Sequence, residues 1–195
     1  MKKLKNIFFV IIFSITVAST QTVWKIDPAH SGVEFTVTYL VISEVKGRFT
    51  EFEGTLTQTK DDFTDSKIEA TINVKSISTD NERRDKHLLT ADFFNSENFP
   101  DITFKNTSFK SNGKNKFNIT GDLTINGITK PVKLDALFKG ETKDPYGNSR
   151  AGFKATTSVN RFDYDVKWNA PLETGVLVVG KTVDIILNIQ LIKEK

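Results

Sequence analysis

The segment GVEFTVTYLV, residues 32–41, alternates apolar and polar side chains along most of its length. Phe35 and Val37 fall on one side of the alternation, and Thr36 and Thr38 fall on the other. Because successive side chains of a strand point to opposite faces, this two-residue period is typical of an antiparallel strand with one buried face. A sheet of such strands must cover its apolar face, and closing the sheet into a barrel does so without exposed edges.

The same alternation recurs along the chain and predicts the fold class. Eight or nine strand-like runs occur, at residues 23–26, 32–41, 44–57, 66–74, 102–109, 117–125, 131–139, 150–159 and 181–192. Parity slips between Phe49 and Phe52, which indicates a bulge or bend in one long strand. We therefore expect an all-β protein that consists of a single antiparallel, lipocalin-like β-barrel.

One segment, residues 81–94, departs from the strand pattern. Helix-forming residues replace β-branched ones there, and Thr79 and Glu82 have the spacing of a capping box, so a short helix is expected to begin near Asn81. An apolar side of this helix would be formed by Leu88, Leu89, Phe93 and Phe94. Such an insert would cover one open end of the barrel and shield its apolar interior from water. The alternative is a helix that packs permanently on the outside.

Residues 1–20 have the layout of a secretory signal peptide. Three lysines lie within the first five residues, an apolar run follows over residues 7–17, and small residues come next. A run of this length is too short to span a bilayer, which favours a cleaved leader over an uncleaved membrane anchor. We therefore expect cleavage within residues 18–22, a mature domain over residues 21–195, and a periplasmic or secreted protein.

The charge of the predicted mature domain is close to zero. The leader holds three of the 27 Lys and Arg residues and none of the 24 Asp and Glu residues, so 24 of each sign remain. A neutral domain lacks the basic surface that binding to nucleic acids or anionic membranes requires. We expect no nucleic-acid partner and no transmembrane segment in the mature chain. The chain has no cysteine, so its core alone must stabilise it.

No pattern in the chain points to catalysis, a metal or a cofactor. The only histidines are His30 and His87, and neither belongs to a metal-binding H-x-x-x-H spacing. The chain contains no G-x-S-x-G nucleophile motif and no glycine-rich phosphate loop. The sequence therefore predicts a protein without enzymatic activity, metal or cofactor.

The inward side chains of the predicted barrel are mostly large and apolar. The candidate lining residues are Phe35, Val37, Tyr39, Phe49, Ile72, Leu88, Phe93, Phe104, Leu123, Leu134 and Phe153. Eight strands enclose an interior that side chains either fill or leave open for one small ligand. Composition does not separate these alternatives. In an open interior, about ten buried carbons at ~0.8 kcal/mol each would reach micromolar affinity before association costs.

Five segments resemble the YceI-like family of exported, lipocalin-like polyisoprenoid-binding proteins. They are WKIDPAHSGVEFTV (24–37), VKGRFTEFEGTL (45–56), NERRDKHLLTADFFNSENFPDITF (81–104), GDLTINGITKPVKL (121–134) and DPYGNSRAGFKATTSVNRFDY (144–164). They cover nearly the whole predicted mature chain in the family's order. The resemblance implies a barrel whose apolar channel holds an isoprenoid chain, with no catalytic residues assigned. The family usually carries histidine where this chain has Tyr39, so ligand choice is expected to differ if that position contacts a headgroup.

The resemblance also covers six polar residues whose role the sequence leaves open. They are Asp27, His30, Arg84, Asp85, Arg161 and Asp163. One interpretation is a polar mouth that recognises a ligand headgroup. The favoured interpretation is structural: these residues hold strand and helix ends onto the barrel, and the neighbouring Arg–Asp pairs supply each other's counter-charge.

From these features we expect an exported, non-enzymatic protein that holds a polyisoprenoid or similar long apolar chain, for carriage or storage. Two alternatives remain at this point. The first is a filled barrel that acts as a stress or scaffold protein, and the second is a lipid-processing enzyme such as a hydrolase or isomerase. The sequence leaves a homodimer open, and it does not identify the lipid.

Overall fold

The computed structural model describes residues 21–170 and 177–195. The predicted signal peptide, residues 1–20, lies outside the described residues. Within them no helix is long and apolar enough to cross a membrane.

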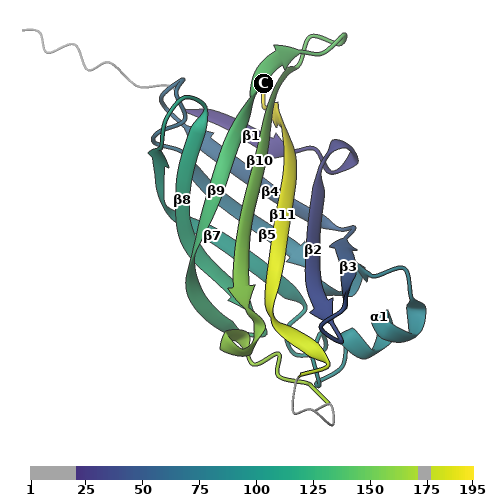
Figure 1. Cartoon of the computed structure of the whole chain (residues 1–195). Coiled ribbons are helices and arrows are strands. Elements are labelled where there is room, and N and C mark those ends of the chain that lie inside the picture. Colours follow the sequence, from purple (N-terminus) through teal and green to yellow (C-terminus); the bar gives the residue numbers. More distant parts are fainter. Residues whose placement is uncertain (1–20, 171–176) are drawn as a thin grey trace, which may run out of the picture.

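The described chain forms one antiparallel sheet that closes into an eight-stranded barrel (Figure 1). The closed sheet contains, in spatial order, β1 (Thr22–Ile26), β4 (Phe52–Gln58), β5 (Lys67–Asn73), β7 (Asp101–Ser111), β8 (Lys116–Ile125), β9 (Ile128–Lys143), β10 (Ser149–Asn160) and β11 (Val179–Lys193). Pairing of Trp24 with Lys193 and of Ile26 with Leu191 joins β1 to β11 and closes the barrel. The predicted fold class is confirmed.

Three shorter strands continue the barrel wall: β2 (Gly32–Tyr39), β3 (Ser43–Phe49) and β6 (Ile77–Ser78). β2 follows β1 along the same edge of β11, where Phe35 pairs with Ile185. Between β1 and β2 lies the 3-10 turn η1 (Pro28–His30), which Asp27 caps by accepting a hydrogen bond from the backbone N–H of Ala29 at 3.1 Å. Proline lacks a backbone N–H and so interrupts the ladder at this corner.

The predicted continuous strand over residues 44–57 is wrong, because residues 50–51 separate β3 from β4. The two strands pair with different partners: β3 pairs with β2 and β6, whereas β4 pairs with β1 and β5. The irregularity expected between Phe49 and Phe52 is thus present, but it takes the form of a break. Such a break allows the strand to bend around the barrel.

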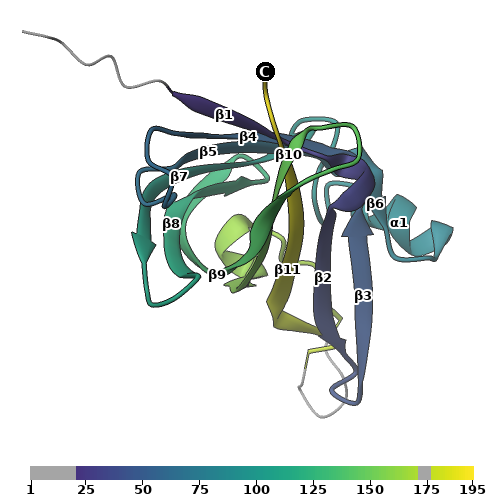
Figure 2. The ribbon, with the colours of Figure 1, turned by 90° about the horizontal axis from the view of Figure 1, so that it is seen from above.

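The helical insert is shorter than expected and lies outside the barrel. α1 (Glu82–Leu88) begins after Asn81, whose side chain accepts a hydrogen bond from the backbone N–H of Arg84 at 3.0 Å, so Asn81 rather than Thr79 is the N-cap. None of its residues is fully buried, and Figure 2 shows it beside β3 and β6. The expected apolar helix side is wrong: Leu88 is its last residue, and Phe93 and Phe94 lie in the turns that follow.

The two ends of the barrel are closed differently. At the end we call the aromatic end, the loop between β4 and β5 inserts Phe63, which packs against Trp24, Phe138 and Phe153. The other end, which we call the η3 end, is closed by the 3-10 turn η3 (Arg161–Tyr164), visible through the barrel in Figure 2.

Candidate ligand cavity

A cavity of about 280 Å³ lies inside the barrel between its two ends. Its wall follows the strand alternation, as on β10, where Phe153, Ala155 and Val159 face inward. Protein interiors rarely hold voids larger than a water molecule, and an apolar engineered cavity about half this size already binds benzene. The interior is therefore not a filled core, and it has room for part of an apolar ligand.

Glycines on neighbouring strands keep two aromatic rings against the wall. A Cβ atom added to Gly47 would lie 2.2 Å from the ring of Phe35, and one added to Gly121 would lie 2.5 Å from the ring of Phe104. Contacts this short do not occur, so each ring occupies the space that a side chain on the adjacent strand would take. The rings therefore line the cavity and do not fill it.

The structure places ten of the eleven predicted lining residues on the cavity wall. They are Phe35, Val37, Phe49, Ile72, Leu88, Phe93, Phe104, Leu123, Leu134 and Phe153. That a ligand contacts them remains a prediction. Alternation identified the strand residues because inward positions of a barrel share one parity.

Tyr39 is not on the cavity wall, which corrects the sequence-based expectation. It is the last residue of β2, it pairs with Ser43 across the hairpin, and its side chain is 38% exposed. The β2–β3 hairpin extends past the cavity and ends in the exposed Val41 and Ile42. Parity along β2 gave the correct face for Tyr39, but the strand outruns the cavity. The departure from the family pattern at this position therefore lies at the rim.

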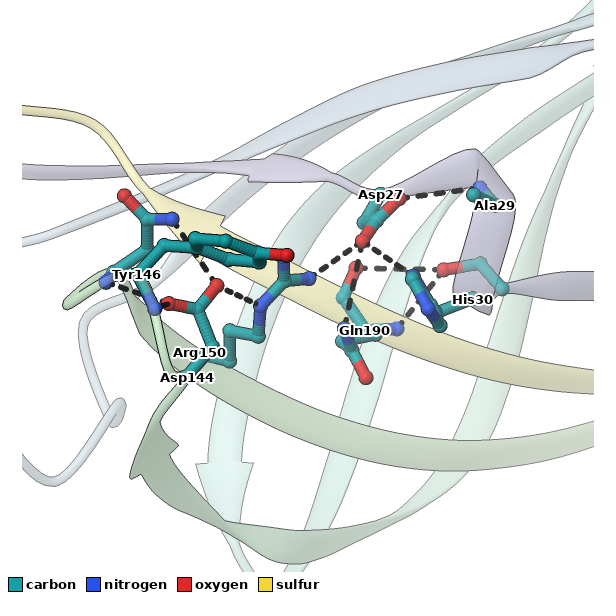
Figure 3. Close-up of polar contacts among 9 residues, drawn as sticks. Asp27, Ala29, His30, Asp144, Tyr146, Arg150 and Gln190 are labelled. Atoms are coloured by element: carbon teal, nitrogen blue, oxygen red, sulfur yellow. Dashed lines mark hydrogen bonds and ion pairs between the residues drawn. The ribbon is translucent and has the colours of Figure 1, made fainter.

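Asp27 and His30 belong to a polar cluster at the β1–β2 corner (Figure 3). The Asp27 carboxylate accepts hydrogen bonds from His30 Nδ1 at 2.8 Å and from the Arg150 guanidinium at 2.6 Å. Arg150 also donates to Asp144 at 2.8 Å, so one cation bridges two carboxylates. This cluster ties the β1–β2 corner to the β9–β10 hairpin, and none of its members lines the cavity.

The cluster shifts the pKa values of its charged groups. Burial alone would raise the pKa of Asp27, but hydrogen bonds from Arg150 and His30 outweigh it and hold that pKa below its ordinary value. The hydrogen bond from Arg150 holds the pKa of Asp144 well below its usual range, and the same bond raises the pKa of Arg150. Sequence analysis missed Arg150 and Asp144, which lie 123 and 117 residues from Asp27 and carry no local signal.

Arg84 and Asp85 meet at Thr79 and not at each other. The Arg84 Nε donates to the Thr79 hydroxyl at 2.6 Å, and the Asp85 carboxylate accepts from the same hydroxyl at 2.5 Å and from the Thr79 backbone N–H at 2.9 Å. No direct Arg84–Asp85 ion pair occurs among the ion pairs of the described residues, so the expected mutual pairing is wrong. Adjacent helix residues point in different directions.

Arg161 and Asp163 do not pair either. The Arg161 guanidinium donates to four backbone carbonyls, those of Val166, Trp168, Val179 and Gly180, at 2.6 to 3.0 Å. Asp163 accepts a hydrogen bond from the Asn160 side chain at 3.2 Å instead. Residues two apart on a helical turn do not face each other, which explains the wrong prediction. Arg161 joins the end of β10 to the start of β11.

The six predicted polar residues therefore form three separate groups and no single mouth. Only Arg161 among them borders the cavity. Neither histidine does, and the side chains of His30 and His87 are 61% and 42% exposed. Within residues 21–170 and 177–195, no group of three or more His, Asp or Glu side chains is arranged to hold a metal ion.

A closed, eight-stranded antiparallel barrel around an enclosed apolar cavity defines the class of lipocalin-like barrels. Residues 24–191 match the family model described as the YceI-like domain. The chain therefore belongs to the YceI-like family.

Relatives and solved structures agree with this assignment. The chain is 38% identical over 174 residues to protein YceI of Escherichia coli O157:H7, an alignment that covers 88% of this chain and 87% of the relative. Its fold is similar to BcnA of Burkholderia cenocepacia, with a TM-score of 0.74 and 21% identity over 85% of this chain and 98% of that one. It is also similar to a polyisoprenoid binding domain from Saccharophagus degradans implicated in plant cell wall breakdown, with a TM-score of 0.66 and 12% identity over 88% and 98%.

Proposed function

We propose that this protein binds a polyisoprenoid or similar long apolar chain inside the barrel and carries or stores it outside the cytoplasm. The observation that supports this proposal most directly is the cavity, whose inward-facing wall is almost entirely aliphatic and aromatic. A structurally similar domain from Saccharophagus degradans is described as polyisoprenoid-binding. Burial of apolar carbon provides the affinity, and little specificity for the middle of the chain is required.

The arrangement of polar groups favours binding without covalent chemistry. General acid–base catalysis needs a titratable side chain within hydrogen-bond reach of the reacting atoms. The His30–Asp27 pair lies at the outer corner of the barrel, and its Asp27 partner is also held by Arg150. His87 faces Asp92 on the outer surface beside α1. A chain held in the cavity would reach neither histidine, so the enzyme alternative lacks its acid–base group.

The experiment compares two neighbouring positions of β7 that face opposite sides of the wall. Phe104→Glu places a carboxylate in the cavity, whereas Thr103→Glu places it on the exposed face. Burial of an unpaired charge against an apolar chain is strongly unfavourable, so Phe104→Glu is expected to lower bound lipid by about 100-fold or more. Thr103→Glu is expected to leave it within about twofold of the wild type.

Bound lipid per mole of folded protein is measured by native mass spectrometry and by extraction of the purified protein. Circular dichroism checks that both variants are folded. Equal lipid content in the two variants would contradict ligand binding in the cavity. The absence of any hydrophobic mass from wild-type protein, together with no uptake of added isoprenoid, would refute the proposal and favour a scaffold role.

A further inference from the structure

The polar side chains that face into the cavity are confined to its η3 end. They are Thr157, Arg161 and Tyr164, which belong to one segment of eight residues. The other polar residues that border the cavity, Glu34, Glu53 and Thr55, occupy outward positions of β2 and β4.

The aromatic end of the cavity carries only apolar side chains. Phe109, Leu134, Ala136 and Phe153 bound it there. The cavity is therefore amphipathic along its length, although most of its wall is apolar.

Tyr164 presents an unused hydrogen-bond donor at the η3 end. Its side chain borders the cavity and the residue is 2% exposed, yet its hydroxyl has no hydrogen-bond partner among the described residues. Buried hydroxyl groups are normally hydrogen-bonded. Burial raises the pKa of Tyr164 to about 12, so the phenol keeps its proton at neutral pH and acts as a donor. A partner for this donor must enter with the ligand and must be an acceptor.

Arg161 gives the same end a positive potential. The residue is 6% exposed, and its four hydrogen bonds all go to backbone carbonyls. No carboxylate pairs with it in the part of the chain that the structure describes. Charge in a low-dielectric interior acts strongly on nearby dipoles. An oxygen atom with partial or full negative charge is therefore favoured beside it.

We propose that the η3 end binds an acceptor oxygen at the polar end of the ligand, with the Tyr164 hydroxyl as the donor and Arg161 as the source of positive potential. This inference rests on the proposed function and adds a direction to it. The oxygen-bearing end of the chain lies at the η3 end, and the hydrocarbon tail extends toward Phe109 and Phe153. An alcohol, a carbonyl and a phosphate all supply such an oxygen, whereas a plain hydrocarbon does not.

The test uses Tyr164→Phe, which removes only the hydroxyl oxygen. Because this hydroxyl has no partner within the described protein, the variant is expected to melt within about 2 °C of the wild type. The control variant is Tyr146→Phe, at a tyrosine that is 88% exposed and outside the cavity. A clear fall in melting temperature for Tyr164→Phe would show that the hydroxyl bonds inside the protein, and it would overturn the inference.

Three probes of equal chain length separate the contributions: geranylgeraniol, the corresponding hydrocarbon without the hydroxyl, and geranylgeranyl phosphate. Each displaces a fluorescent apolar dye from delipidated protein. Wild type and Tyr146→Phe are expected to bind geranylgeraniol about tenfold more tightly than the hydrocarbon. In Tyr164→Phe this preference is expected to disappear, while affinity for the hydrocarbon stays the same.

The outcomes distinguish this inference from the function on which it rests. Equal binding of alcohol and hydrocarbon by wild type would overturn the inference and leave apolar binding intact. A preference that survives Tyr164→Phe would also overturn it. Binding of none of the three probes would refute the proposed function together with the inference. If the phosphate binds more tightly than the alcohol and loses that advantage in Tyr164→Phe, the acceptor is anionic, and the inference holds.

Discussion

Two phenylalanines provide a stability test of whether the barrel interior is open. Phe63 is 3% exposed and packs against Trp24, Phe138 and Phe153 at the aromatic end, with ring centroids 6.2, 5.2 and 5.2 Å away. Phe35 is only partly buried, because one side of its ring lies on Gly47 and the other borders the cavity. Truncation of each to alanine removes the same atoms from different surroundings.

The expected destabilisation follows from the contacts that each ring loses. Phe63→Ala removes a ring that is packed on all sides, and such changes lower the free energy of unfolding by about 3–5 kcal/mol. Phe35→Ala loses contacts mainly on one side, so roughly half of that, about 2 kcal/mol, is expected. For a domain of this size each kcal/mol lowers the melting temperature by about 2–4 °C. The expected falls are therefore about 6–20 °C for Phe63→Ala and about 4–8 °C for Phe35→Ala.

The measurement is thermal and urea denaturation of delipidated protein, followed by circular dichroism. Thr36→Ala, at the outward neighbour of Phe35, is the control, and its unfolding free energy is expected within about 0.5 kcal/mol of the wild type. Equal destabilisation by Phe63→Ala and Phe35→Ala would show that the Phe35 ring is packed on both sides. That result would refute an open cavity and restore the filled-core alternative.

Three further predictions concern the leader, the charged cluster and α1. Removal of residues 1–20 is expected to leave a soluble protein with the circular dichroism of β-structure, and aggregation of the truncated chain would contradict this. The lowered pKa of Asp144 stabilises the fold above the unfolded-state value near 3.9, and this contribution is lost as pH falls through the folded value. Melting temperature should therefore fall between pH 5 and pH 2 in the wild type and change less in Arg150→Met. Leu88→Gly is expected to speed release of a fluorescent isoprenoid, and Glu82→Ala to do so less; unchanged release with a lower melting temperature would make this segment purely structural.

The barrel could be predicted from the sequence because its signal is local and repeated. Along β10, alternation alone identified Phe153 as inward, and the structure places its neighbours at the same parity on the cavity wall. The position of the strand break was also visible, since the parity slip between Phe49 and Phe52 needs only adjacent residues. The length of each strand relative to the cavity was not visible, which is why Tyr39 was placed on the wall.

The open interior could not be predicted, because it depends on which residues face each other across strands. Phe35 has the same inward parity whether its ring crosses the interior or lies on the wall. Its orientation follows from pairing with Gly47, and that register is fixed by the whole β2–β3 hairpin. In the same way, Arg150 joins Asp27 only after the barrel has closed, whereas the adjacent Arg84 and Asp85 share no direct contact.

The two barrel ends carry the information that the wall lacks. Many aliphatic and aromatic sequences satisfy the wall, because burial of apolar surface has no direction. The ends depend on single side chains: Phe63, which a charged loop inserts into the core, and Tyr164, which brings a hydroxyl to the cavity on a four-residue turn. Substitution at these positions changes which ligand end is accepted without disturbing strand pairing. Within this fold we therefore expect ligand choice to follow the residues of η3 and of the β4–β5 loop, and chain binding itself to follow the alternation of the strands.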